Sequence, residues 1–237
     1  MNRSTLLGLS ICFALAAVPT ISQQIPAGNV RMHIQGIQIP PVGDAPFTAK
    51  VVVRWDRPLV GGGTNSQKYY TLVARDSQGR VRREIRAFVP ADSTVEPPLR
   101  SFTILDPVAG TRTVCTMATM TCAVSAFNAN LALSQNNSDR GNTSSESLGQ
   151  LTIDGLPTTG TRETVSRVTG PRGSSQVAVS HTEAWHSPDL QMDLSVTRTD
   201  PQSGVVTLDV TDLVQGEPDS NWFTIPPGYT IKGSKTQ

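Results

Sequence analysis

The feature that most constrains this chain is a tight turn, rich in Asp, Pro and Gly, that recurs between stretches of β-prone residues. Four such turns occur, at residues 76–79, 106–110, 170–173 and 199–204. In turns of this kind Asp accepts hydrogen bonds from the backbone, and Gly adopts the positive φ that closes a hairpin. Each turn therefore predicts a β-hairpin, and the series predicts an antiparallel meander.

The segments between these turns favour strands. Phe47 begins a run of β-branched and aromatic residues that continues to Trp55 and ends before Pro58. Helical periodicity is scarce, with weak exceptions at residues 130–135 and 145–151. The sequence therefore predicts a mainly β fold, built on an antiparallel sheet with little helix.

The beginning of the chain is typical of a secretory signal peptide. Arg3 precedes an apolar run from Leu6 to Val18, which gives way to polar residues at Ser22. A helix needs roughly 20 apolar residues to span a bilayer, so this run is shorter than a membrane-spanning anchor requires. We expect residues 1–22 to be removed on export to the periplasm or the extracellular space.

The remainder is expected to form an extended arm over residues 23–46 and a single β domain over residues 47–237. Residues 129–147 are too polar to bury and too long for an ordinary connection, so they predict a mobile loop within this domain. A linker between two small domains is the alternative interpretation of this stretch.

The net charge of the chain argues against two kinds of partner. The chain carries 20 basic and 19 acidic residues, a formal net charge of +1. This near-neutral balance argues against a nucleic acid or an anionic membrane surface as the main partner. No motif indicates a cofactor.

Two cysteines, Cys115 and Cys122, lie beyond the signal segment. In an exported protein we expect them to form a disulfide across a hairpin. A redox or metal pair is the alternative, but their spacing is not Cys-x-x-Cys and no second pair completes a zinc site.

No catalytic or metal-binding motif stands out. The chain lacks a Gly-x-Ser-x-Gly elbow, and period 2 places His181 and His186 on opposite faces of a strand. Acid pairs such as Asp189 and Asp193 are also what a solvated sheet face shows. A non-enzymatic protein is the expectation, with a hydrolase of dispersed catalytic residues as the remaining alternative.

Two groups of residues are candidates for binding. The large aromatic residues, which also suit core packing, could line an apolar groove: Trp55, Tyr69, Trp185, Trp222, Phe223 and Tyr229. A basic patch contains Arg75, Arg80, Arg82, Arg83 and Arg86, and alternation places Arg80, Arg82 and Arg86 on one face with Glu84. These three arginines could bind an anionic partner, or pair with Asp76 and Glu84 on a solvated face.

Several stretches resemble an uncharacterised family of secreted bacterial proteins. They are residues 75–84, 105–107, 148–149, 160–164, 183–190, 197–201, 217–219 and 223–229. At a coarser level, the Asp-Pro-x-x-Gly turn and the closing Phe-x-x-Pro-x-Gly-Tyr resemble the outer-membrane lipoprotein carrier superfamily. That resemblance implies a strongly curved antiparallel sheet, an open half-barrel whose concave face holds acyl chains under a helical lid. This chain differs in its few helix signals, its polar loop around Asn136 and its cysteine hairpin.

Together these observations predict a curved antiparallel sheet, an open half-barrel or meander, in an exported envelope protein. Its predicted function is to bind an apolar or amphipathic ligand, a lipid or lipoprotein, on the concave face. The alternative is a structural or protein-interaction subunit that pairs with another envelope protein through an edge strand or the arm at residues 23–46.

Overall fold

The computed structural model describes residues 37–128, 142–169 and 176–233. Every described residue belongs to one compact unit within residues 35–237. The described elements are β1 (Phe47–Pro58), β2 (Thr64–Arg75), β3 (Val81–Arg86), β4 (Val89–Pro90), β5 (Leu99–Asp106), β6 (Thr111–Thr116), β7 (Thr121–Ala126), β8 (Asn142–Ile153), β9 (Leu156–Thr169), β10 (Gln176–Ser187), β11 (Met192–Asp200), β12 (Gly204–Gln215), the 3-10 helix η1 (Ser220–Phe223) and β13 (Thr230–Gly233).

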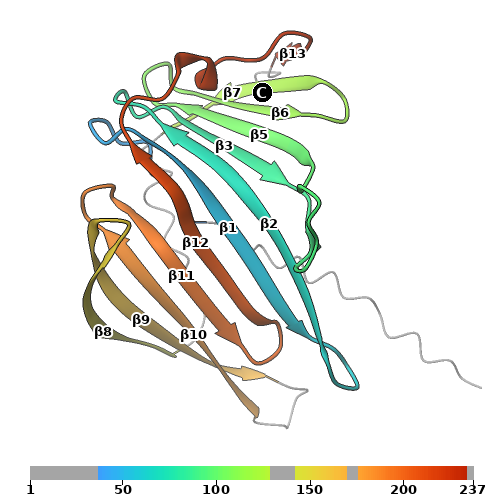
Figure 1. The fold of residues 1–237 in the computed structure, drawn as a ribbon, viewed down its shortest axis with the longest axis vertical. Helices are drawn as coiled ribbons and strands as arrows, with labels where there is room; N and C mark the ends of the chain where they lie inside the picture. The colour runs from blue at the N-terminus through green and yellow to red at the C-terminus, as the bar shows by residue number, and fades with distance from the viewer. Residues whose placement is uncertain (1–36, 129–141, 170–175, 234–237) are drawn as a thin grey trace, which may run out of the picture. The chain divides into compact units, whose positions relative to one another are not determined.

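These thirteen strands belong to one sheet, in the order β13-β7-β6-β5-β3-β2-β1-β12-β11-β10-β9-β8, with the short β4 beside β2. Figure 1 shows them side by side, with β8 at one edge and β7 and β13 at the other. The predicted fold class is confirmed, since the sheet is curved, unclosed and dominated by antiparallel pairs. The β13–β7 pair is parallel.

The sheet consists of two meanders joined along one seam. Strands β1, β2, β3, β5, β6 and β7 follow one another in space as in sequence, and so do β8 to β12. The seam is the antiparallel pair β1–β12, in which Val51 lies opposite Val210 and Val53 opposite Leu208. The two halves of the chain therefore share one sheet.

The predicted hairpins form at the turns that the Asp, Pro and Gly residues indicated. In the β2–β3 turn, Asp76 Oδ1 accepts hydrogen bonds from the backbone N–H groups of Gln78 and Arg80, and Gly79 has a φ of 78°. Asp106 and Asp200 accept backbone N–H groups in the same way in the β5–β6 and β11–β12 turns. Strands β9 and β10 also pair, although residues 170–175 lie outside the described residues.

The structure corrects the end of the predicted polar loop. Residues 142–147 form the start of β8 and pair with β9, and the weak helix signal at 145–151 is also strand. The polar composition suggested a loop because such residues cannot be buried. β8, however, pairs on one side only among the described residues, so its Ser, Thr and Glu side chains remain exposed. Residues 129–141, including the helix signal at 130–135, lie outside the described residues, as does most of the predicted arm.

One face of the sheet is concave. Arg75, on β2, donates from Nη2 to the carbonyl oxygen of Leu190 in the β10–β11 turn at 2.8 Å. Strands β1 and β12 separate β2 from β11 in the sheet, and adjacent strands lie about 4.8 Å apart. A single side chain can reach that turn only if the structure bends toward the face that carries Arg75. We call this face concave and the opposite face convex.

Candidate functional site

Alternate residues of the central strands build an apolar concave face. Directly opposed residues of an antiparallel pair share a face, so the register that places Val51 opposite Thr71 and Val210 identifies the rest of that face. Fifteen side chains of this face are at most 8% exposed: Phe47, Ala49, Val51, Val53, Tyr69, Thr71, Val73, Arg75, Val81, Met192, Leu194, Val196, Val206, Leu208 and Val210.

Arg75 ties two segments to one end of this face. It is fully buried, and its guanidinium donates to the carbonyl oxygens of Ala45 at 2.9 Å, Pro40 at 3.1 Å and Leu190 at 2.8 Å. The guanidinium carbon also lies 5.0 Å from the centroid of the Phe47 ring. Burial lowers the pKa of Arg75 to about 10, so it remains charged at neutral pH. Its role is to hold residues 40–45 and the β10–β11 turn in place.

A pocket of about 590 Å³ lies beside that end of the concave face. The segment before β1 forms one wall, β3 and β5 form another, and the residues around the β10–β11 turn complete it. The lining residues are Gln38, Ile39, Pro40, Pro41, Val42, Arg83, Leu105, His186, Gln191, Met192 and Asp193. The lining is mixed, with six apolar residues and five polar or ionisable ones, and the volume lies in the range of small-molecule sites, about 300 to 1,000 Å³.

Three ionisable groups line this pocket. Arg83 lies on the concave face, because it pairs with Val73 of β2 in the ladder. Its burial lowers the pKa of the guanidinium, an effect that Tyr69 partly opposes. His186 Nδ1 lies 3.0 Å from Asp193 Oδ1, and the two side chains are 51% and 36% exposed.

The sequence placed Arg83 in a basic patch but did not select it as a binding candidate. Alternation along β3 was the available signal, since it assigns Arg83 to the face opposite Arg82 and Glu84. It could not indicate which of the two faces is concave.

The six aromatic candidates do not converge on one site. Trp55 and Tyr69 lie on the concave side, where both contact Phe88 with ring centroids 6.2 and 4.6 Å apart. Trp185 lies on the convex face, where it pairs with Gly160. Its indole ring covers that glycine, because a Cβ built there would come within 2.5 Å of the ring.

Trp222, Phe223 and Tyr229 pack on the convex face, where they belong to one cluster with the cysteine hairpin. Its buried members are Ala74, Phe102, Ile104, Cys115, Cys122 and Phe223, with Trp222, Ile225 and Tyr229 packed against them. Cys115 and Cys122 form a disulfide, as predicted, and face each other across the β6–β7 pair. This cluster anchors the segment that contains η1 and β13 on the sheet.

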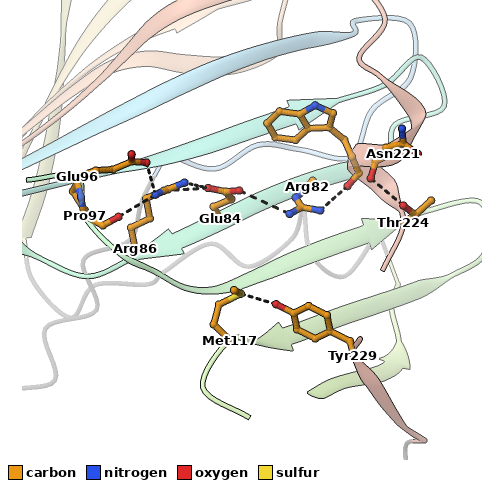
Figure 2. Close-up of polar contacts among 10 residues, drawn as sticks. Arg82, Glu84, Arg86, Glu96, Pro97, Met117, Asn221, Thr224 and Tyr229 are labelled. Atoms are coloured by element: carbon orange, nitrogen blue, oxygen red, sulfur yellow. Dashed lines mark hydrogen bonds and ion pairs between the residues drawn. The ribbon is translucent and has the colours of Figure 1, made fainter. Parts of the chain in front are cut away.

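The arginine candidates have partners within the protein. Figure 2 shows a polar ladder on the convex face, in which Glu84 lies between Arg82 and Arg86 and Arg86 also contacts Glu96. Arg82 further donates to the carbonyl oxygen of Trp222 at 3.1 Å. Arg80 pairs with Asp76. Pairing to Asp76 and Glu84 was one of the two interpretations of this patch.

A hollow of about 500 Å³ lies between this ladder and the residues around η1. Its charged side chains Arg82 and Glu84 already contact each other, whereas Arg83 in the concave pocket has no such contact among the described residues. The concave pocket is therefore the better candidate for binding an exogenous molecule.

No metal site is evident among the described residues, where no group of three or more His, Cys, Asp or Glu side chains could hold an ion. Of the two histidines in that part of the chain, His181 contacts Thr164, with Nδ1 and Oγ1 3.0 Å apart, and His186 contacts Asp193. In the same residues no helix is long and apolar enough to span a membrane.

No protein-family model and no curated protein matches this sequence. Several solved structures are similar to the chain. An uncharacterised conserved protein from Thermus thermophilus is 12% identical with a TM-score of 0.44, over 80% of this chain and 90% of that one. A LolA superfamily protein from Nitrosomonas europaea is 12% identical with a TM-score of 0.31, over 76% and 90%.

The lipoprotein LppX from Mycobacterium tuberculosis is also similar, at 16% identity and a TM-score of 0.30, over 73% of this chain and 88% of that one. A LolA superfamily protein is thus among these structural neighbours.

Proposed function

We propose that this chain is an exported envelope protein that binds an amphipathic ligand, a lipid or the lipid of a lipoprotein, in the pocket of the concave face. The observation that carries the proposal is a pocket of about 590 Å³, lined by both apolar and polar residues, beside a buried apolar sheet face. Ile39, Leu105 and Met192 offer contacts to an alkyl chain, while Arg83 and His186 provide polar ones. Export is supported by the N-terminal segment and by the buried disulfide.

The pocket walls also suit a ligand that enters and leaves. The segment at residues 38–42 contains no strand or helix and forms one wall, whereas the opposite wall belongs to the sheet. A wall without regular hydrogen bonding opens locally more readily than a strand in the middle of a sheet.

The first prediction tests this proposal directly. The full chain, exported from a bacterial host and purified without detergent, should carry a bound acyl species in native mass spectrometry. It should also bind hexadecanol, a neutral long-chain probe, when stripped. Leu105→Gln should weaken hexadecanol binding roughly tenfold, because it removes apolar contact area inside the pocket.

Val108→Gln is the matched control. Val108 lies in the β5–β6 turn, three residues after Leu105, and is 74% exposed. It should leave binding unchanged. A chain that is purified empty and does not bind hexadecanol would rule out the proposed function.

A further inference from the structure

The arginines around β3 have different partners. Arg80 forms an ion pair with Asp76, and Arg82 and Arg86 both contact Glu84. Arg83 forms no ion pair and no side-chain hydrogen bond with any residue in the ranges 37–128, 142–169 and 176–233. Among the described residues its electrostatic interaction is with Tyr69, whose hydroxyl is neutral at physiological pH.

Arg83 is partly buried, and burial lowers the pKa of its guanidinium. Val73 and Thr103 flank it in the ladder, and it shares the pocket with Leu105 and Met192. Burying a charge without a partner is costly, and proteins normally compensate with an opposite charge or with hydrogen bonds. Arg75, on the adjacent strand, shows such compensation, since three carbonyl oxygens accept from its guanidinium. Arg83 lacks an equivalent set among the described residues.

The remaining charged groups of the pocket do not replace that partner. Asp193 is its one acidic lining residue, and Asp193 is paired with His186 at 3.0 Å. Among the described residues, the guanidinium of Arg83 therefore has no ion-pair partner, in a lining that also contains the apolar side chains of Leu105 and Met192. The planar guanidinium fork matches the two oxygens of a carboxylate or a phosphate.

We propose that the ligand of the concave pocket is an anionic amphiphile, whose carboxylate or phosphate headgroup binds Arg83 while its alkyl chain lies against Leu105 and Met192. This inference rests on the proposed function and adds the charge of the ligand to it. Arg83 is accordingly a specificity-determining residue, which distinguishes anionic from neutral lipids of the same chain length.

The test compares three probes that share one alkyl chain: hexadecanoate, hexadecyl phosphate and hexadecanol, each below its micelle concentration. Calorimetry or probe displacement on the stripped full chain measures the affinity of each. At least one anion should bind about tenfold or more tightly than hexadecanol, since a hydrogen-bonded charge pair contributes about that factor. The anion that binds more tightly identifies the headgroup class.

Arg83→Met removes the charge but keeps an unbranched apolar side chain. It should reduce anion binding about tenfold and hexadecanol binding by much less, so that the preference for anions is lost, and Arg83→Lys should retain part of the preference. Arg100→Met is the control, because Arg100 is an exposed arginine of the adjacent strand β5 and does not line the pocket. Its affinities should equal those of the wild type.

The outcomes separate the two proposals. Equal binding of all three probes, with no effect of Arg83→Met, would overturn the anionic headgroup while leaving a lipid-binding pocket. Failure of every probe, hexadecanol included, would reject the pocket itself. A thermal melt of each variant shows that a lost preference does not arise from unfolding.

Discussion

At the scale of single residues, neighbours in sequence have opposite environments. Arg82 belongs to the convex ladder, where its guanidinium carbon lies 4.1 Å from the centroid of Phe102 and its charge faces Glu84. Arg83 points to the concave face, because successive side chains of a strand alternate. One position along β3 therefore decides whether an arginine joins the convex ladder or lines the concave pocket.

Glycine conformation gives a prediction at this scale. Gly204 starts β12 with a φ of 90°, and a Cβ built there would lie 2.1 Å from the carbonyl oxygen of Asp56. Gly61 has a similar φ of 93° but has nothing within 4 Å of such a Cβ. Gly61→Ala should cost about 1 to 2 kcal/mol of unfolding free energy. Gly204→Ala should cost about 1 to 3 kcal/mol more, because the backbone must also move.

Urea denaturation of the two variants and the wild type measures both costs. Because the two glycines share a φ, the difference between their costs reports the contacts of the added Cβ with Asp56, Arg57 and Pro58. Equal destabilisation would show that the β11–β12 turn can shift away from β1 at little cost.

At the scale of elements, the cysteine hairpin holds the last segment of the described chain. β13 pairs in parallel with β7, with Ile231 opposite Cys122. Phe102, under the disulfide, meets the ring of Tyr229 edge-on with centroids 5.7 Å apart. The disulfide therefore stabilises both the β6–β7 hairpin and the surface on which Trp222, Phe223 and Tyr229 pack.

Removing this disulfide should destabilise the protein measurably. The chain-entropy model assigns about 2 to 3 kcal/mol to so short a loop, and the double variant Cys115→Ala, Cys122→Ala also loses packing under Phe223. We expect a lower urea midpoint for this variant and for the reduced wild type.

Dithiothreitol should lower the midpoint of the wild type but not that of the double variant, which serves as the control for effects of the reductant itself. A wild type with the same midpoint in both conditions would show that the bridge contributes nothing to stability.

At the scale of the whole molecule, the seam between β1 and β12 joins the two meanders. β1 is paired with β2 along its entire length and with β12 over most of it, apart from an irregularity between Thr48 and Lys50. β8 pairs only with β9 among the described strands. Local stability should therefore fall from the seam toward the β8 edge.

Hydrogen exchange should show this gradient. Amides of β1 should exchange only through global unfolding, whereas those of β8 should exchange at least about 100-fold faster through local opening. Mass spectrometry or NMR on the full chain resolves the two strands. Equal protection of β8 would indicate that another chain covers this edge, as expected for a protein-interaction subunit that pairs through an edge strand.

Much of the local structure could be predicted, since it depends on neighbouring residues. Residues a few positions apart determine three of the predicted features: the β2–β3 turn with its Asp and Gly, the strand that begins at Phe47, and the cysteine hairpin. The predicted loop over residues 129–147 was wrong at residues 142–147, for a related reason. Composition shows that a segment cannot be buried, but an edge strand such as β8 does not require burial.

The candidate site was much less predictable. Trp55 and Tyr69 on one face, and Trp222, Phe223 and Tyr229 on the other, look alike in sequence as large apolar groups. Their separation depends on the register of each strand and on the path of the chain after β12. Those are consequences of pairing between residues far apart in sequence.

The sequence by itself determined the mainly β fold, the hairpins and the cysteine bridge, because turn geometry and alternation act between adjacent residues. Tertiary structure alone decided that β1 pairs with β12, which face is concave, and that Arg83 lines a pocket while Arg82 is paired. The sheet has a concave face only after strands far apart in the sequence have paired, and no local pattern encodes which strands pair. The direction in which the sheet curves therefore decides which alternate residues of each strand lie on the concave face.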